Sequence, residues 1–181
     1  MPFRKYKIPF AAIEHQTKLF DLIKDLIQNN NMEFDQLKLE NQLCFPLYAA
    51  SRLIIREYQQ HLDKLEITYP QYLVLMVLWE TDNISVNDIS QKLILNTNTV
   101  TPLLKRMEVQ GIITRNRSER DERKVMIKLT EKGLFMRTEA ASIPEKLLAC
   151  ILSDGMKVEE LIDMKEKLNV LINYLSKDKT E

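Results

Sequence analysis

Apolar residues recur along most of this chain with the three- and four-residue spacing of amphipathic helices. The pattern predicts one helix within residues 1–38, a second over about 41–65 and a third over the apolar run 72–79. The third is apolar on every face, which is typical of a helix in the middle of a core. Thr68 and Gln71 form a candidate capping box at its start.

Two shorter helices joined by a tight turn are predicted next. Ser85 and Asp88 form a second candidate capping box, and the helix that they open turns Ile89 and Leu93 inward. After a turn of three or four residues, another helix continues until Gly111, where a C-terminal stop belongs. Such a pair is a candidate helix-turn-helix motif. The inward residues of its second helix are Val100, Leu103, Leu104 and Met107.

After Gly111 the apolar period changes to the alternation of β-strands. Residues 112–117 can form one strand, and in residues 124–129 every second residue, Val125, Ile127 and Leu129, is apolar and lies on one face. The segment 118–123 between them is wholly polar or charged, so it forms the tip of a β-hairpin. A helix-turn-helix followed by such a hairpin is the winged arrangement.

The remainder of the chain is predicted to be helical. One helix starts near Thr130 and is interrupted at Pro144, a short helix follows, and Gly155 precedes the last one. The apolar residues of the last helix nearly follow a heptad, so they need a partner surface. A second subunit supplies one solution, and packing within the chain is the alternative. The stripe comprises Val158, Leu161, Ile162, Leu168, Leu171, Ile172 and Leu175.

Composition narrows the functional classes. The 181 residues include only 3 Gly, so neither of the glycine-rich phosphate-binding motifs can be written. There is no CxxC pair and no HExxH, and we expect no metal site and no cofactor. No apolar run approaches the roughly 20 residues of a membrane span, and the basic N-terminus lacks the long apolar core of a signal peptide. We therefore expect a cytoplasmic protein whose 2 Cys are mostly reduced.

Positive charge is concentrated around the predicted wing. The chain has no net charge, yet residues 101–130 hold eight basic and four acidic residues. Affinity for nucleic acid depends on such concentration, because each neutralised phosphate releases counterions. A charged hairpin tip alone is common, but this one directly follows a helix-turn-helix. The polar face of the second helix and the first strand supply the candidate DNA-binding residues Thr97, Asn98, Thr99, Thr101, Lys105, Arg106 and Arg115. Ordinary N-capping by Thr97 or Asn98 is the other reading of that helix start.

Three segments together resemble the MarR family of winged-helix regulators: TYPQYLVLMVLWE, TVTPLLKRMEVQGIITR and SERDERKVMIKLTEKG. The segment LENQLCFPLYAASRLIIREY resembles the organic-hydroperoxide-sensing (OhrR-type) repressors within it, and the likeness covers roughly residues 39–152. The resemblance implies a fold that is mainly α with a small β-hairpin wing: a winged helix-turn-helix dimerised through N- and C-terminal helices. It also implies a homodimer that represses by binding a pseudo-palindromic operator in double-stranded DNA.

Several family positions carry over. The peroxide-sensing cysteine matches Cys44, and the tyrosines around it match Tyr48, Tyr58 and Tyr69, the last two reaching over from the partner subunit in the family. The Asp-x-Arg of the wing matches Asp121 and Arg123, with the arginine entering the minor groove and the aspartate holding it. Some members have a resolving cysteine after an Ile-Pro, and Cys150 lies in that region. An organic hydroperoxide would then be the inducer.

The sequence departs from the family at Pro46, at Asn98, where relatives often have a smaller residue, and in its long N-terminal segment. A thiol reacts with a peroxide as its thiolate, and a free thiol has a pKa of about 8.5. Tyr48 lies one helical turn after Cys44 and could donate to the anion. We hypothesise that Pro46 places Cys44 near a helix N-terminus, where the helix dipole favours a thiolate. Taken alone, a cysteine between Leu43 and Phe45 is most often a small core residue.

The resemblance also sets the expected domains. Residues 1–38 form an appendage, expected to be an amphipathic helix packed on the body, with a membrane-surface helix as the weaker interpretation. Residues 39–181 form the MarR-like domain: 67–130 are the winged helix-turn-helix, and 39–66 and 131–181 supply dimerisation helices.

Three functions remain open at this point. The first is a repressor that senses organic peroxides through Cys44 and then releases its operator. The second is a MarR-like repressor induced by a small phenolic or apolar ligand, with Cys44 a bystander. The third is a thiol peroxidase, which gives no reason for a basic wing. We therefore expect a regulator and not an enzyme.

Overall fold

The computed structural model describes residues 34–153 and 155–176, so residues 1–33, most of the segment in which the first helix is predicted, lie outside the described residues. The chain divides into two units, one ending at Leu53 and the other starting at Ile54. Helix α2, Cys44–Leu62, begins in the first unit and ends in the second.

The remaining elements follow in chain order. Short 3-10 helices are η1 Asp35–Leu37, η2 Leu39–Asn41 and η3 Asp63–Leu65. The helices of the second unit are α3 Tyr69–Glu80, α4 Val86–Leu93, α5 Thr97–Val109, α6 Glu131–Ala140, α7 Ile143–Ser153 and α8 Val158–Ser176. The strands are β1 Ile84–Ser85, β2 Ile113–Arg117 and β3 Val125–Leu129.

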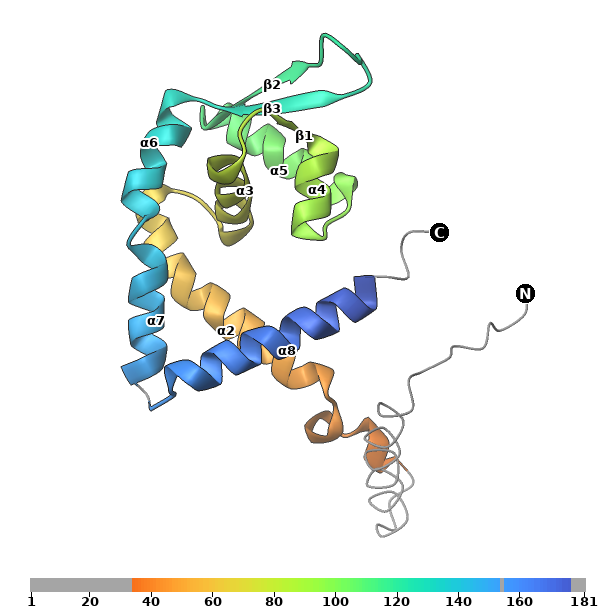
Figure 1. The fold of residues 1–181 in the computed structure, drawn as a ribbon, viewed down its shortest axis with the longest axis vertical. Coiled ribbons are helices and arrows are strands. Elements are labelled where there is room, and N and C mark those ends of the chain that lie inside the picture. Colours follow the sequence, from red (N-terminus) through yellow and green to blue (C-terminus); the bar gives the residue numbers. More distant parts are fainter. Residues whose placement is uncertain (1–33, 154, 177–181) are drawn as a thin grey trace, which may run out of the picture. The chain divides into compact units, whose positions relative to one another are not determined.

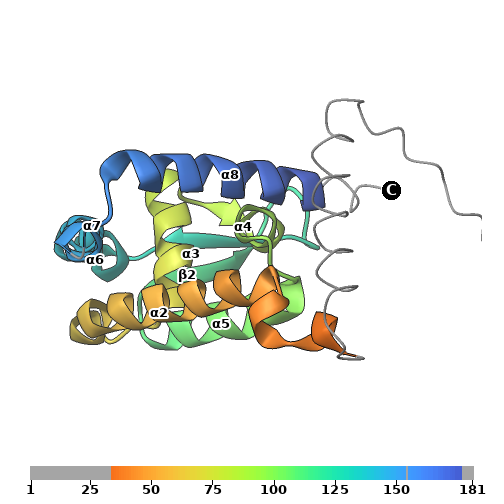
Figure 2. The same cartoon turned by 90° about the horizontal axis from the view of Figure 1, so that it is seen from below.

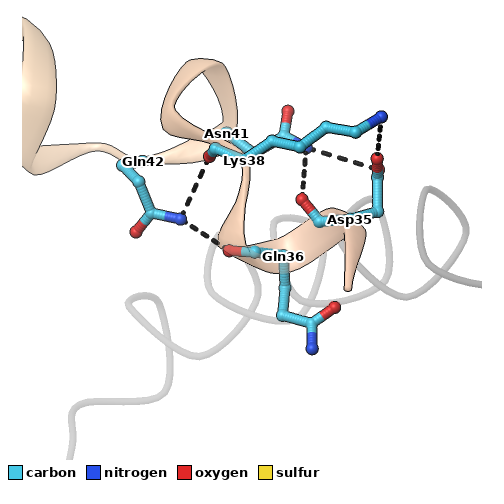
Figure 3. A network of polar contacts seen from close by, with 5 residues as sticks. All are labelled: Asp35, Gln36, Lys38, Asn41 and Gln42. Atoms are coloured by element: carbon cyan, nitrogen blue, oxygen red, sulfur yellow. Dashed lines mark hydrogen bonds and ion pairs between the residues drawn. The ribbon is translucent and has the colours of Figure 1, made fainter. Parts of the chain in front are cut away.

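A network of polar contacts precedes α2 in the first unit. The carboxylate of Asp35 lies 2.6 Å from the Lys38 ammonium, and the Asn41 side chain donates to the Asp35 carbonyl oxygen at 2.9 Å. The Gln42 amide donates to the carbonyl oxygens of Gln36 and Lys38 (Figure 3). These bonds close η1 and η2 into two consecutive tight turns ahead of Cys44.

The helix predicted over about 41–65 starts later than expected, while its helical backbone continues through α2 and η3 to Leu65. Gln42 has an extended backbone, with φ −90° and ψ 117°, so the helix cannot run through it. The regular helix starts at Cys44, which puts Pro46 at its third residue. A proline in the first turn costs little, because the N–H that it lacks has no partner within the helix. At the other end, the chain leaves α2 through η3 and a left-handed residue, Glu66, with φ +53°.

The core of the second unit forms around α3, as its uninterrupted apolar sequence predicts. Thr68 caps α3, and its backbone N–H donates to the Gln71 side-chain oxygen at 2.8 Å, which confirms the predicted capping box. Buried residues of α3 cluster with Ile89 of α4 and with the inward face of α5. The four predicted inward residues of α5 are all buried: Val100, Leu103, Leu104 and Met107.

Helices α4 and α5 form the predicted helix-turn-helix. Ser85 and Asp88 make the second capping box, with the Asp88 N–H donating to Ser85 Oγ at 3.2 Å. The connection is the three residues 94–96, and it reverses direction through Ile94, whose φ is +55°. Gly111, with φ +71°, follows α5 where the sequence predicted its end.

The wing is a three-stranded sheet, whereas the sequence predicted only a hairpin. Strands β2 and β3 pair antiparallel from Ile113 opposite Leu129 to Arg117 opposite Val125. The two-residue strand β1 adds to the other side of β3, with Ile84 opposite Ile127. Figure 1 shows the β2–β3 hairpin extending beyond α3, α4 and α5, and Figure 2 shows the same sheet from below.

The C-terminal helices differ from the prediction in the position of the break between α6 and α7. Helix α6 ends at Ala140, and α7 starts at Ile143 with Pro144 as its second residue. The interruption therefore precedes the proline, which again occupies a first turn. Among the described residues of α8 none is buried, and Ile162 in its apolar stripe is 53% exposed.

Candidate functional site

The first turn of α5 presents short polar side chains to solvent. Its N-cap is Asn96, so the predicted capping by Thr97 or Asn98 is wrong: both residues lie inside the first turn. Thr97, Asn98 and Thr99 are all exposed. Free backbone N–H groups and hydroxyl or amide side chains at a helix start suit phosphates and base edges. Further along the same helix, Thr101 is half-buried and both Lys105 and Arg106 are exposed.

The tip of the wing carries an arginine held by a neighbouring aspartate. Arg123 Nε donates to Asp121 Oδ1 at 3.1 Å, and the Arg123 backbone N–H donates to the same oxygen at 3.2 Å. The structure thus brings together the two wing residues that the sequence singled out. Asp121 thus orients the Arg123 side chain, which stays exposed to solvent.

Arg115 lies on β2 in a different setting. Its guanidinium donates to the Glu108 carboxylate at 3.3 Å, and its side chain is only 17% exposed. It is paired across the sheet with Ile127, which is fully buried, and cross-strand partners share a face. The arginine therefore links β2 to the last turns of α5 as well as adding positive charge.

Cys44 is exposed at the first residue of α2. This position confirms the predicted placement of the thiol at a helix N-terminus, although Pro46 has no N–H and the Phe45 N–H already donates to the Gln42 carbonyl oxygen at 3.3 Å. Tyr48 follows one turn later on the same helix and is 59% exposed. Its ring is covered in part by Arg52, whose guanidinium carbon lies 5.7 Å from the ring centroid. The only cation that the sequence places shortly after Cys44 is thus stacked on this tyrosine.

Tyr58 and Tyr69 meet in the second unit. Their ring centroids are 4.9 Å apart, and Tyr72 adds a third ring at 5.8 Å from Tyr58. We call Tyr58, Tyr69 and Tyr72 the tyrosine cluster. Burial raises the pKa of all three phenols above the usual 10.0. Like an ordinary phenol, each is therefore protonated at neutral pH and can donate. The apolar run 72–79 predicts Tyr72 only as a core residue, whereas its spacing of three from Tyr69 is the signal for the cluster.

Cys150, the other cysteine, lies on α7 and is exposed. Its carbonyl oxygen accepts a hydrogen bond from the Ser153 hydroxyl at 2.7 Å. Among the described residues, the Cys150 sulfur takes part in no hydrogen bond. The thiol is thus accessible to a reagent or to another thiol.

Two absences hold for the part of the chain that the structure describes. None of its helices combines the length and apolar character that a membrane crossing needs. No group of three or more His, Cys, Asp or Glu side chains is arranged to hold a metal ion within residues 34–153 and 155–176.

Comparison with known proteins adds independent findings. A family model described as transcriptional regulator SarA/Rot matches residues 56–136. The organic hydroperoxide resistance transcriptional regulator of Bacillus subtilis is 49% identical over 143 residues, which is 79% of this chain and 95% of the relative.

Solved structures of AbfR from Staphylococcus epidermidis are also similar. Reduced AbfR bound to DNA superposes with a TM-score of 0.63 at 35% identity, covering 80% of this chain and 99% of AbfR. A disulfide-containing form of AbfR matches with a TM-score of 0.52 at 37% identity over 78% of this chain and 98% of AbfR.

Proposed function

This chain belongs to the MarR family of winged-helix transcriptional regulators, and we propose that it is a repressor that releases its operator when an organic hydroperoxide oxidises Cys44. The relatives are regulators and not enzymes. The observation that carries the proposal is the exposed Cys44 at the first residue of α2, in a chain 49% identical to an organic hydroperoxide resistance regulator.

DNA binding is supported by the surface around α5 and the wing. The polar start of α5 suits a major groove, and Arg123, oriented by Asp121, suits the narrow minor groove beside it. Reduced AbfR, 35% identical, has been solved bound to DNA. We propose that the contacts come from Thr97, Asn98, Thr99, Thr101, Lys105, Arg106, Arg115, Asp121 and Arg123.

A second copy of the chain completes the binding unit. The apolar stripe of α8 has no buried member within the described chain, and a partner helix would cover it. Two wings related by a twofold axis then read a pseudo-palindromic operator, because the symmetry of the site mirrors that of the dimer. We retain 39–66 and 131–181 as the dimerisation segments.

The proposed chemistry starts from the Cys44 thiolate. Its sulfur attacks the terminal oxygen of the hydroperoxide, the O–O bond breaks, and the other oxygen leaves as an alcohol after taking a proton. Cys44 is oxidised to a sulfenic acid and the peroxide is reduced. A Cys150 thiol can then attack that sulfur, which forms a disulfide and releases water.

We propose that the tyrosines couple this oxidation to the DNA-binding surface. Tyr48 and the partner subunit's copies of Tyr58 and Tyr69 would donate hydrogen bonds to the thiolate. A sulfenic acid or disulfide accepts them less well, so the network rearranges. A difference of a few kcal/mol between the two states suffices to empty an operator.

The test is operator binding before and after oxidation. The DNA upstream of the protein's own gene is titrated with reduced protein and with protein treated with cumene hydroperoxide. We expect wild type to lose at least tenfold in affinity and Cys44→Ser to lose none, while Cys150→Ser separates a sulfenic acid response from a disulfide response. Release of Cys44→Ser by peroxide would refute the sensing role. Release by a phenolic ligand together with indifference to peroxide would support the alternative, ligand-induced repressor.

A further inference from the structure

A buried glutamine links the first turn of α3 to the end of α5. The Gln71 side chain, 4% exposed, accepts the Thr68 N–H through Oε1 at 2.8 Å. Its Nε2 donates to Gln110 Oε1 at 2.7 Å, and Gln110 Nε2 donates to the Glu66 carbonyl oxygen at 3.2 Å. One amide thus closes the capping box of α3, and the same amide holds the residue that caps α5.

Gln71, at one end of this link, lies on the same helical turn as two members of the tyrosine cluster. Gln71 is two residues after Tyr69 and immediately before Tyr72, on the first turn of α3. The ring centroids of Tyr69 and Tyr72 are 6.4 Å apart. Any shift of these rings that carries the first turn of α3 with it also moves the Gln71 amide.

Gln110, at the other end of the link, caps α5, the helix whose first turn presents the short polar side chains. Gln110 is the C-cap of α5, and its own carbonyl oxygen accepts a hydrogen bond from Lys132 Nζ at 3.0 Å. The rest of α5 is held by its buried apolar face and by the ion pair between Glu108 and Arg115. Apolar packing is non-directional, whereas a hydrogen bond of 2.7 Å tolerates only small displacements. The Gln71–Gln110 bond therefore constrains how α5 is rotated and tilted on α3.

We propose that the hydrogen bond between Gln71 and Gln110 transmits the position of the tyrosine cluster to α5, which makes Gln110 a positioning residue for DNA recognition. The inference rests on the proposed function for the identity of the ligand at α5. It adds a physical link between the tyrosine cluster, which is proposed to respond to oxidation, and α5, which is proposed to bind DNA.

Gln110→Ala is the main test, because Gln110 lies at the surface end of the link. For reduced protein, we expect operator affinity to fall three- to tenfold while affinity for non-operator duplex stays within twofold. Phosphate contacts dominate non-operator binding and do not depend on the tilt of α5. We also expect the loss of operator affinity on peroxide treatment to be at least fivefold smaller than in wild type. Mass spectrometry should show Cys44 oxidised equally in both proteins.

Two further variants separate positioning from folding. Gln71→Glu keeps the capping oxygen for Thr68 but removes the amide donor to Gln110, and it should reproduce the effect of Gln110→Ala. Gln36→Ala is the matched control, because the Gln36 side chain is exposed and lies outside the proposed DNA-binding and dimerisation segments. Thermal unfolding of each variant identifies any that are simply destabilised.

The outcomes distinguish this inference from the proposed function. An operator preference in Gln110→Ala equal to wild type would overturn the inference. A wild type that keeps its DNA with Cys44 fully oxidised would overturn the sensing role. In that case the reduced-state comparison of operator and non-operator DNA still decides whether Gln110 positions α5.

Discussion

Asp121 holds Arg123 at the tip of the wing, with Oδ1 accepting both the side-chain Nε–H at 3.1 Å and the backbone N–H at 3.2 Å. The Arg123 side chain nevertheless remains 91% exposed. An arginine that is oriented before it binds loses less side-chain entropy on contact, and freezing such a side chain costs up to about 2 kcal/mol. Exposed ion pairs contribute little to the free energy of unfolding. The effect of this pair is to orient the arginine before DNA binds.

Removing the arginine should change the salt dependence of binding. We expect Arg123→Ala to weaken operator binding about tenfold and to make the slope of log K against log salt less steep by about 1.8, because each of the two wings loses one cation and each neutralised phosphate contributes about 0.9. Asp121→Asn should lower operator affinity but keep the slope, since the cation is still present. Fluorescence anisotropy at several salt concentrations measures both. Lys167→Ala, in which a cation paired with Asp163 is lost, serves as the control. An unchanged slope in Arg123→Ala would exclude a phosphate contact.

Arg115 should behave differently although it has the same charge. Its guanidinium is paired with Glu108 and largely covered, so Arg115→Ala removes packing and an ion pair together. We expect a loss of about 1–2 kcal/mol in unfolding free energy and a change of salt slope smaller than that of Arg123→Ala. Thermal melts and the same anisotropy titration check this. A full change of slope with an unchanged melting temperature would mean that Arg115 swings out to the DNA.

The sequence could predict what depends on local patterns. Both capping boxes, at Thr68 and at Ser85, were predictable because the partner residue lies only three positions away. The wing was predictable because Val125, Ile127 and Leu129 recur at every second position and so share one face of a strand. The placement of Cys44 at a helix start followed from Pro46, whose cost depends only on its distance from the helix end.

What escaped prediction depends on contacts that are distant in sequence or on very short segments. Strand β1 has two residues, too few to show any alternation, and it exists because β3 offers a free edge. The bond between Gln71 and Gln110 joins residues 39 positions apart. The inward orientation of Arg115 follows from its register opposite Ile127, which no composition or charge count reveals.

Two prolines should have opposite effects on stability when they are replaced. Pro46 is the third residue of α2, so Pro46→Ala removes only a restriction on the unfolded chain and should lower the unfolding free energy by up to about 1 kcal/mol. Pro102 lies inside α5, where it removes a bond to the carbonyl oxygen of Asn98. Pro102→Ala should therefore raise the unfolding free energy, by up to about 3 kcal/mol.

Urea denaturation at one fixed protein concentration measures both changes, since the stability of a dimer depends on concentration. Opposite signs are the essential expectation. A stabilising Pro46→Ala would mean that Pro46 interrupts a helix that starts earlier than Cys44.

The tyrosine cluster predicts a loss of stability in alkali. Burial raises the pKa values of Tyr58, Tyr69 and Tyr72 in the folded state above the 10.0 of an exposed phenol. Below pH 10 the phenols are protonated in both states, so their contribution is fully present. As the pH rises above 10, the unfolded state releases protons first, and stability falls until the pH passes the folded pKa values. Urea denaturation between pH 8 and about pH 11 should show this decline.

Replacing one member of the cluster with phenylalanine should reduce the steepness of the decline, because one titrating group is removed. Tyr69→Phe is the informative variant, and Tyr174→Phe, which alters an exposed tyrosine on α8, is the matched control. Equal pH dependence in all three proteins would contradict a role for burial. At neutral pH all three phenols carry their protons, which a hydrogen-bond donor to a thiolate requires. A cluster that titrated below pH 8 could not serve that purpose.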